Sequence, residues 1–120
     1  MTAIRSFAFA TAHQIRFGRG AMDEAPAAIM SFGARVFLVI GSSSARATSL
    51  IAELEKAGAS VALFHVSGEP TVELALTGVD AARAHAADVV VSLGGGSAID
   101  AGKAIAALLT NPGSPFDYLE

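Results

Sequence analysis

The sequence predicts an α/β protein with a Rossmann-like, doubly wound, mainly parallel sheet. Short apolar runs alternate with stretches of helical periodicity along the 120 residues. Successive strand–helix units of this kind need crossover connections, which produce parallel strands with right-handed connections. Polar or glycine-rich loops also follow two of the apolar runs, at the strand ends where such sheets bind ligands.

Composition narrows the class of protein. Apolar residues make up 52% of the chain and charged residues 16%, which supports a single domain with a substantial core and argues against disorder. The net charge is −3, and Lys and Arg are scattered, so no nucleic-acid-binding face is predicted. The absence of cysteine excludes disulfides and thiolate metal sites and is consistent with a cytoplasmic protein. No apolar run reaches the roughly 18 residues of a membrane helix, and no signal peptide is predicted.

The N-terminal region is predicted to form two short strands and a helix. Ser6–Ala10 and Gln14–Phe17 have the pattern of strands. Asp23–Phe32 is expected to be helical, with acidic residues in its first turn, and Gly33 suits a left-handed helix end.

Three strand–helix units follow. The first strand is a continuous apolar run, as expected for a strand that is covered on both faces. Gly58 is expected to end the first helix and Thr71 to cap the second. The predicted strands are Arg35–Ile40, Ser60–Val66 and Asp88–Leu93, and the helices run from about Ala45 to Ala57, Thr71 to Ala86 and Ser97 to Leu109.

Three glycines, Gly94, Gly95 and Gly96, directly follow the most hydrophobic strand. Glycines there allow a close approach of the backbone, and the next helix directs its free N–H groups at the loop, which predicts a pyrophosphate site. Ser97 and Asp100 have the spacing of a capping box, although the Ser97 hydroxyl could bind a phosphate oxygen instead. The alternative is a plain tight turn between strand and helix.

Neither of the two common phosphate-binding motifs is present. The dinucleotide fingerprint G-x-G-x-x-G requires glycine where Ile99 stands. The Walker A motif requires glycine where Ser97 stands and Ser or Thr in place of Ala104.

The glycine loop resembles a known family. The run from Gly94 to Ala104 is similar to the signature G-G-G-S-x-x-D-x-x-K-A of iron-containing (group III) alcohol dehydrogenases. The run from Ile15 to Gly20 resembles the family's I-x-F-G-x-G. Glu69 stands where many members carry Asn in an Asn-Pro-Thr turn.

The resemblance implies a dehydroquinate synthase-like N-terminal domain that binds NAD(P) and covers residues 1–120. By this resemblance Gly95, Gly96 and Ser97 contact the cofactor pyrophosphate and Asp100 lies near the nicotinamide. Lys103 adds charge near the phosphates or is simply solvated.

The loop formed by Gly41, Ser42, Ser43 and Ser44 is predicted to determine whether NAD or NADP is preferred. Many NAD-using members have Asp at the first of these positions, where its carboxylate accepts hydrogen bonds from the adenosine ribose. Glycine and serines leave room for a 2′-phosphate, and Arg46 could pair with it. We therefore expect NADP rather than NAD; the alternative is an ordinary loop in which Ser44 caps the next helix.

The family resemblance also implies a function for the parent protein, which is hydride transfer between a nicotinamide and an alcohol/carbonyl pair. A divalent metal, Fe or Zn, would be held by a helical C-terminal domain absent from the sequence. The chain is therefore predicted to be a truncated cofactor-binding portion, with no catalytic or metal-binding residue. His13, His65 and His85 are too scattered to be a ligand cluster. A small-molecule alcohol or aldehyde is the expected substrate, and exposed apolar surface predicts a homo-oligomer.

Several alternatives remain at this point. Metal-independent relatives such as maleylacetate reductase lack the signature Asp, so Asp100 argues against them. Glycerol dehydrogenases and dehydroquinate synthases share the fold but match the signature less well. A non-catalytic nucleotide-binding module would bind cofactor without turnover, and a purely structural or interaction domain would bind no nucleotide.

Overall fold

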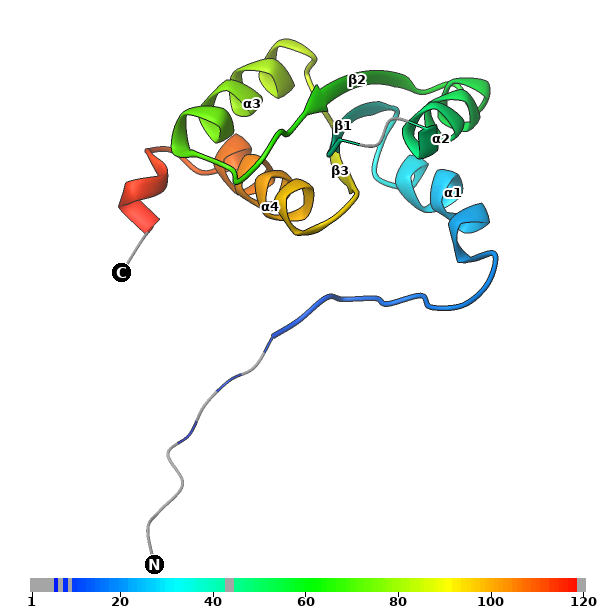
Figure 1. The fold of residues 1–120 in the computed structure, drawn as a ribbon, viewed down its shortest axis with the longest axis horizontal. Coiled ribbons are helices and arrows are strands. Elements are labelled where there is room, and N and C mark those ends of the chain that lie inside the picture. The colour runs from blue at the N-terminus through cyan, green and yellow to red at the C-terminus, as the bar shows by residue number, and fades with distance from the viewer. Residues whose placement is uncertain (1–5, 7, 9, 43–44, 119–120) are drawn as a thin grey trace, which may run out of the picture.

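A computed structural model describes residues 6, 8, 10–42 and 45–118. Within this part of the chain lies a sheet of three parallel strands, β1 (Arg35–Ile40), β2 (Ser60–His65) and β3 (Val89–Leu93). Their order is β2-β1-β3, so β1 is the central strand (Figure 1). The predicted parallel α/β architecture is confirmed.

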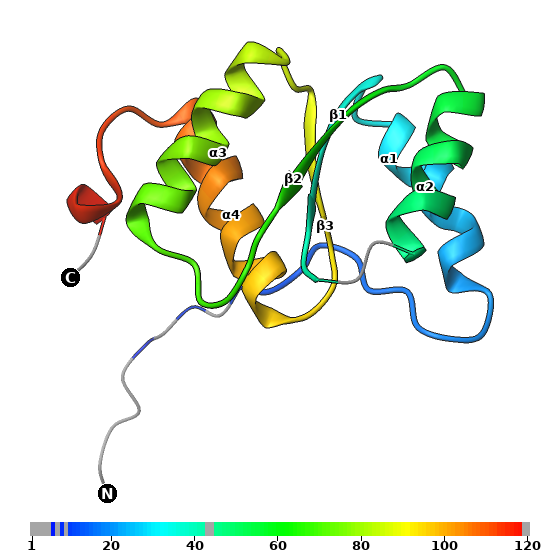
Figure 2. The ribbon, with the colours of Figure 1, turned by 45° about the horizontal axis from the view of Figure 1, so that its top comes forward.

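Helices cover both faces of the sheet, as Figure 2 shows. The short α1 (Ala25–Met30) and α2 (Ala45–Lys56) lie on one face. α3 (Val72–Ala84) and α4 (Gly96–Thr110) pack side by side on the other. Two short 3-10 helices, Ala21–Glu24 and Pro115–Tyr118, precede α1 and follow α4.

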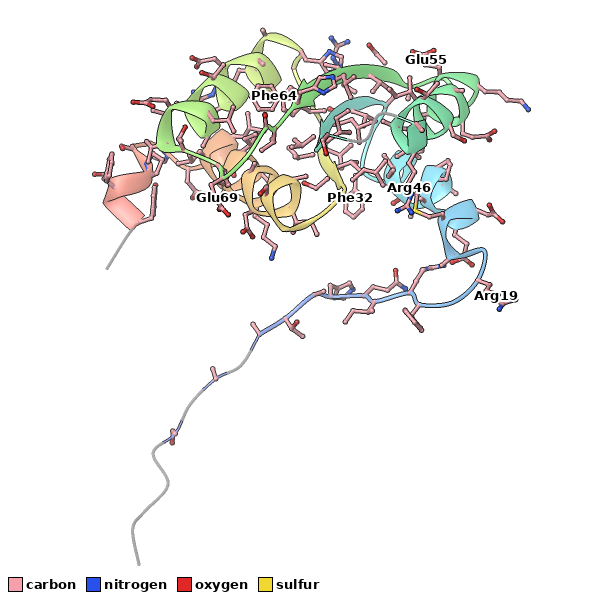
Figure 3. All side chains as sticks on the ribbon, in the orientation of Figure 1. Arg19, Phe32, Arg46, Glu55, Phe64 and Glu69 are labelled. Carbon is pink, nitrogen blue, oxygen red and sulfur yellow. The ribbon has the colours of Figure 1, made fainter. Side chains whose placement is uncertain are left out.

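The central strand supplies side chains to two separate cores. All of β1 after its first residue is buried. Phe37 and Val39 point towards α3 and α4, and the ring centroid of Phe37 lies 5.7 Å from that of Phe64. Phe64, from β2, is labelled in Figure 3. Leu38 and Ile40 point towards α1 and α2. This alternation of buried side chains explains why the strand is apolar at successive positions.

Glycine allows α4 to lie close to its neighbours. A Cβ at Gly102 would overlap the hydroxyl of Ser92 on β3, and a Cβ at Gly78 would overlap the side chain of Ile105. Gly102 therefore allows α4 to pack closely on the sheet. Gly78, which belongs to α3, allows α3 and α4 to pack closely against each other.

The predicted N-terminal strands are wrong where the structure describes them. Residues 14–17 form no strand, and neither do residues 6, 8 and 10, while residues 7 and 9 lie outside the described part. Ile15 and Phe17 are exposed, at 75% and 101%. The alternating pattern suits a strand, but no neighbouring strand in the described chain pairs with it.

Several predicted helix ends also shift. The helix expected over residues 23–32 is a 3-10 turn followed by α1, with Pro26 in its first turn. Thr71 caps α3 as predicted, accepting a hydrogen bond from the Leu74 N–H. α3 ends at Ala84, two residues earlier than expected.

We predict that Gly102→Ala lowers the free energy of unfolding by about 1–3 kcal/mol, because the added methyl meets Ser92 in a packed interface. The measurement is chemical denaturation followed by circular dichroism. Gly96→Ala is the matched control in the same helix, since its Cβ would meet nothing within 4 Å. In a Ser92→Ala background Gly102→Ala should cost less; an unchanged cost would contradict the proposed clash.

A second prediction compares two helix ends. α2 and α3 both end in a Schellman motif, with Gly58 in the left-handed position of one and Ala86, at φ 54°, in the other. Ala86→Gly should raise the free energy of unfolding by about 1 kcal/mol, and Gly58→Ala should lower it by a similar amount. Thermal or urea unfolding measures both, and equal signs for the two changes would refute the explanation.

Candidate functional site

The loops that follow the three strands surround a cavity of about 320 Å³ at the carboxyl edge of the sheet. Each strand contributes to its wall. The lining residues are 41–42 after β1, 66–68 after β2, and 93–98 at the end of β3 and the start of α4. Parallel sheets place ligands at this edge.

The glycine loop forms one side of the cavity. Gly94 has φ 139°, and a Cβ there would lie 3.5 Å from the backbone nitrogen of Gly41. Only glycine adopts this conformation without strain. The distance of 3.5 Å is an ordinary contact, so the loops after β1 and β3 lie side by side, and the positive φ is what requires glycine at position 94.

The first turn of α4 presents free N–H groups beside the cavity. Ile99 has the first N–H in α4 that donates within the helix, to the Gly95 carbonyl at 3.1 Å. In the described chain, the N–H groups of Gly96, Ser97 and Ala98 have no acceptor. They make up the unsatisfied donors of a helix N-terminus, where the helix dipole is positive.

The predicted capping box is wrong. Gly95, in extended conformation, is the N-cap of α4, and no side chain caps the helix. Ser97 therefore lies inside the first turn and Asp100 in the second. Because the glycine loop lets the helix begin one residue earlier than predicted, the Ser97 hydroxyl is left without a helical partner and lines the cavity.

Ser92 anchors this end of α4 to the sheet. Its hydroxyl donates to the carbonyl of Ala98 at 2.9 Å, and Gly102 packs directly over it. Sequence reasoning did not single out Ser92. The signal that could have identified Ser92 is a polar side chain near the end of an otherwise aliphatic strand.

No charged side chain is among the described residues that line the cavity. Asp100 and Lys103 are exposed on α4 and do not line it. Of the predicted loop after β1, Gly41 and Ser42 line the cavity, whereas Ser43 and Ser44 lie outside the described residues.

Arg46, the predicted partner of a 2′-phosphate, lies elsewhere. It lines a different cavity between α1 and α2, together with the carboxylates Asp23 and Glu53. Figure 3 shows it on the α1–α2 side of the sheet, away from Glu69 in the loop after β2. The structure thus does not bring Arg46 to the glycine loop.

The loop after β2 is the part of the cavity that the sequence analysis missed. Val66, Ser67 and Gly68 line the wall because β2 pairs with β1 in register, with Ile40 opposite His65. Strand order, which was not predicted, decides which loops become neighbours.

The residues that the structure describes contain no group of three or more His, Asp or Glu side chains placed to hold a metal ion. None of their helices has the length and apolar character needed to cross a membrane.

Comparison with known proteins places the chain in a family. It is 30% identical to NADH-dependent butanol dehydrogenase A of Clostridium acetobutylicum, over 96% of this chain and 31% of that protein. It is 34% identical to probable NADH-dependent butanol dehydrogenase 1 of Bacillus subtilis, over 97% and 31% respectively. It is also 34% identical to NAD-dependent methanol dehydrogenase of Bacillus methanolicus, over 84% and 28%.

The chain thus spans about a third or less of the length of these relatives. A family model described as iron-containing alcohol dehydrogenase matches residues 12–120. The match includes the glycine loop and every strand and helix of the described fold. The chain therefore belongs to the iron-containing alcohol dehydrogenase family.

Proposed function

We propose that residues 1–120 are the nucleotide-binding part of an alcohol dehydrogenase, and that the cavity binds the pyrophosphate of a nicotinamide adenine dinucleotide. The observation that carries this proposal is the row of free N–H groups on Gly96, Ser97 and Ala98 beside a cavity at the carboxyl edge of the sheet. A phosphate there accepts hydrogen bonds from the main chain and interacts favourably with the helix dipole.

Glycines at positions 94–96 suit this role. A Cβ at Gly95 or Gly96 would meet nothing within 4 Å, so both backbones face open space that a ligand can occupy. The exposed backbone allows phosphate oxygens to come within hydrogen-bond distance of the amides. Recognition would depend on main-chain groups and on the Ser97 hydroxyl, without a cationic side chain.

The reaction is proposed from the family and from the names of the relatives. A hydride, carrying two electrons, would move between the nicotinamide C4 and the carbonyl carbon of an alcohol/aldehyde pair, while the hydroxyl proton leaves separately. A divalent metal would supply Lewis-acid polarisation of the substrate oxygen. In this proposal residues 1–120 bind and orient the cofactor.

The position of Arg46 argues against the expected preference for NADP. NADP was predicted because Gly41 leaves space and Arg46 could pair with a 2′-phosphate. Arg46 instead lines another cavity with two carboxylates, and no described cation replaces it. The three relatives named above are called NADH- or NAD-dependent. We therefore propose NAD(H) as the preferred cofactor.

Titration of the protein with NADH and with NADPH, followed by nicotinamide fluorescence, tests this proposal. We expect saturable binding of both, with a lower Kd for NADH because the 2′-phosphate has no cationic partner. Circular dichroism confirms folding. If neither nucleotide binds to the folded protein, the proposed function is wrong; tighter binding of NADPH would restore the preference predicted from the sequence.

Gly95→Asp provides a sharper test of the anion site. Asp is a favoured N-cap residue. At position 95 its carboxylate would accept hydrogen bonds from the same N–H groups that, in our proposal, bind the phosphate. The helix should become more stable by about 0.5 kcal/mol, while NADH affinity falls at least about tenfold. Gly95→Ala is the uncharged control and should retain more of the affinity. Stabilisation with unchanged affinity would refute the assignment.

A further inference from the structure

We propose that Ser92 is a positioning residue for phosphate binding, and that its hydroxyl strengthens the Gly96 N–H through a chain of two peptide groups. Ser92 lies on β3 and does not line the cavity. The inference rests on the proposed function and deepens it, because it assigns part of the affinity for the cofactor to a side chain outside the cavity wall.

Two hydrogen bonds connect Ser92 to the glycine loop. The Ser92 hydroxyl donates to the Ala98 carbonyl at 2.9 Å. That carbonyl belongs to the same peptide group as the Ile99 N–H, which donates to the Gly95 carbonyl at 3.1 Å. The Gly95 carbonyl in turn shares its peptide group with the Gly96 N–H, which has no acceptor among the described residues and lies beside the cavity. The chain therefore ends on a free donor of the proposed phosphate site.

The hydrogen bonds in this chain are ordered head to tail. Each acceptor carbonyl belongs to the peptide group that supplies the next donor. A hydrogen bond accepted by a carbonyl polarises its peptide group, which makes the N–H of that group a stronger donor, and the effect is larger away from water. The bond from Ser92 is partly buried. Polarisation that begins at this hydroxyl therefore favours an anion on the Gly96 N–H.

The same hydroxyl restrains the first turn of α4. Few hydrogen bonds inside a helix hold its first turn, and no side chain caps α4. Ser92 holds this turn from the sheet side, because it binds the carbonyl of Ala98, a residue that also carries one of the free N–H groups. Donors that are fixed before the ligand arrives lose less conformational freedom on binding. The contact thus favours phosphate binding by preorganisation as well.

Gly102 makes room for this contact. A Cβ at position 102 would lie 1.8 Å from the hydroxyl oxygen of Ser92, so a larger residue would displace either the hydroxyl or the helix. Ser92 is the single polar residue of β3, whose other residues are Val and Leu. Burying a hydroxyl is unfavourable unless it forms a hydrogen bond, and the Ala98 carbonyl provides the acceptor. Ser92 and Gly102 therefore act together.

The test measures the Kd of inorganic pyrophosphate by isothermal titration calorimetry and that of NADH by nicotinamide fluorescence. Ser92→Ala should weaken both ligands about three- to tenfold, because it removes the hydroxyl at the start of the chain. Ser92→Thr keeps a hydroxyl and should bind both ligands within about twofold of the wild-type affinity. Circular dichroism confirms that each variant is folded. If Ser92→Ala does not fold, Ser92→Cys replaces it, because a thiol is only a weak donor.

Val90→Ala is the matched control for a purely structural role. Val90 lies two residues before Ser92 on β3 and packs against the core beneath α3 and α4. Its side chain would lie 3.9 Å from a Cβ at Gly102. Truncation at position 90 should lower the free energy of unfolding at least as much as Ser92→Ala does, because it removes apolar contacts between strand and helix. The affinity for pyrophosphate should stay unchanged.

A spectroscopic measurement follows the chain itself. In the protein without ligand, the amide NMR resonances of Ile99 and Gly96 should both shift in Ser92→Ala, because their peptide groups lose the polarisation. The two resonances should return towards their wild-type positions in Ser92→Thr. Unmoved resonances in folded Ser92→Ala would contradict the proposed chain.

The binding outcomes separate this inference from the proposed function. If wild-type protein binds pyrophosphate and NADH but Ser92→Ala binds both with unchanged affinity, the inference alone is wrong. An equal loss of affinity in Ser92→Thr or in Val90→Ala would also overturn it, since the loss would then come from packing and not from the hydroxyl. If folded wild-type protein binds neither ligand, the proposed function fails and this inference with it.

Discussion

The close packing of α4 against β3 is the contact on which the site depends. Gly102 brings the helix directly over Ser92, whose hydroxyl holds the carbonyl of Ala98. This contact sets how closely α4 lies on the sheet. The free N–H groups beside the cavity therefore belong to a helix that is held on β3 both in its first turn, at Ala98, and further along, at Gly102. Interiors pack too tightly to absorb an extra methyl group without moving the helix.

Much of the fold could be predicted because β1 is buried on both faces. A strand with apolar side chains at successive positions requires a layer of helices on each side, and that requirement leads to parallel strands and crossover connections. The N-terminal segment shows the opposite case. Ile15 and Phe17 alternate with polar residues, as in a strand. A strand also needs a hydrogen-bonded neighbour, and the sequence pattern does not show whether one is present.

The site was predicted in part, for similar reasons. The glycine loop is local in sequence, and its position after an apolar strand was sufficient to place it at the carboxyl edge of the sheet. The error at Ser97 arose because serine is a good N-cap residue, whereas the extended Gly95 takes that position instead. Ser67 could not be found locally, because its place on the cavity wall depends on β2 pairing with β1. Arg46 follows the loop after β1 in sequence, but it lies in the cavity between α1 and α2.

The main-chain character of the proposed phosphate site has an evolutionary consequence. Backbone N–H groups are present whatever side chain a residue carries, so the proposed phosphate contacts do not require a particular side chain. The loops after β1 and β2 also line the cavity and are separate in sequence from the glycine loop. Under the proposed function, a lineage could change its preferred dinucleotide through substitutions in these two loops while the main-chain phosphate contacts stay unaltered.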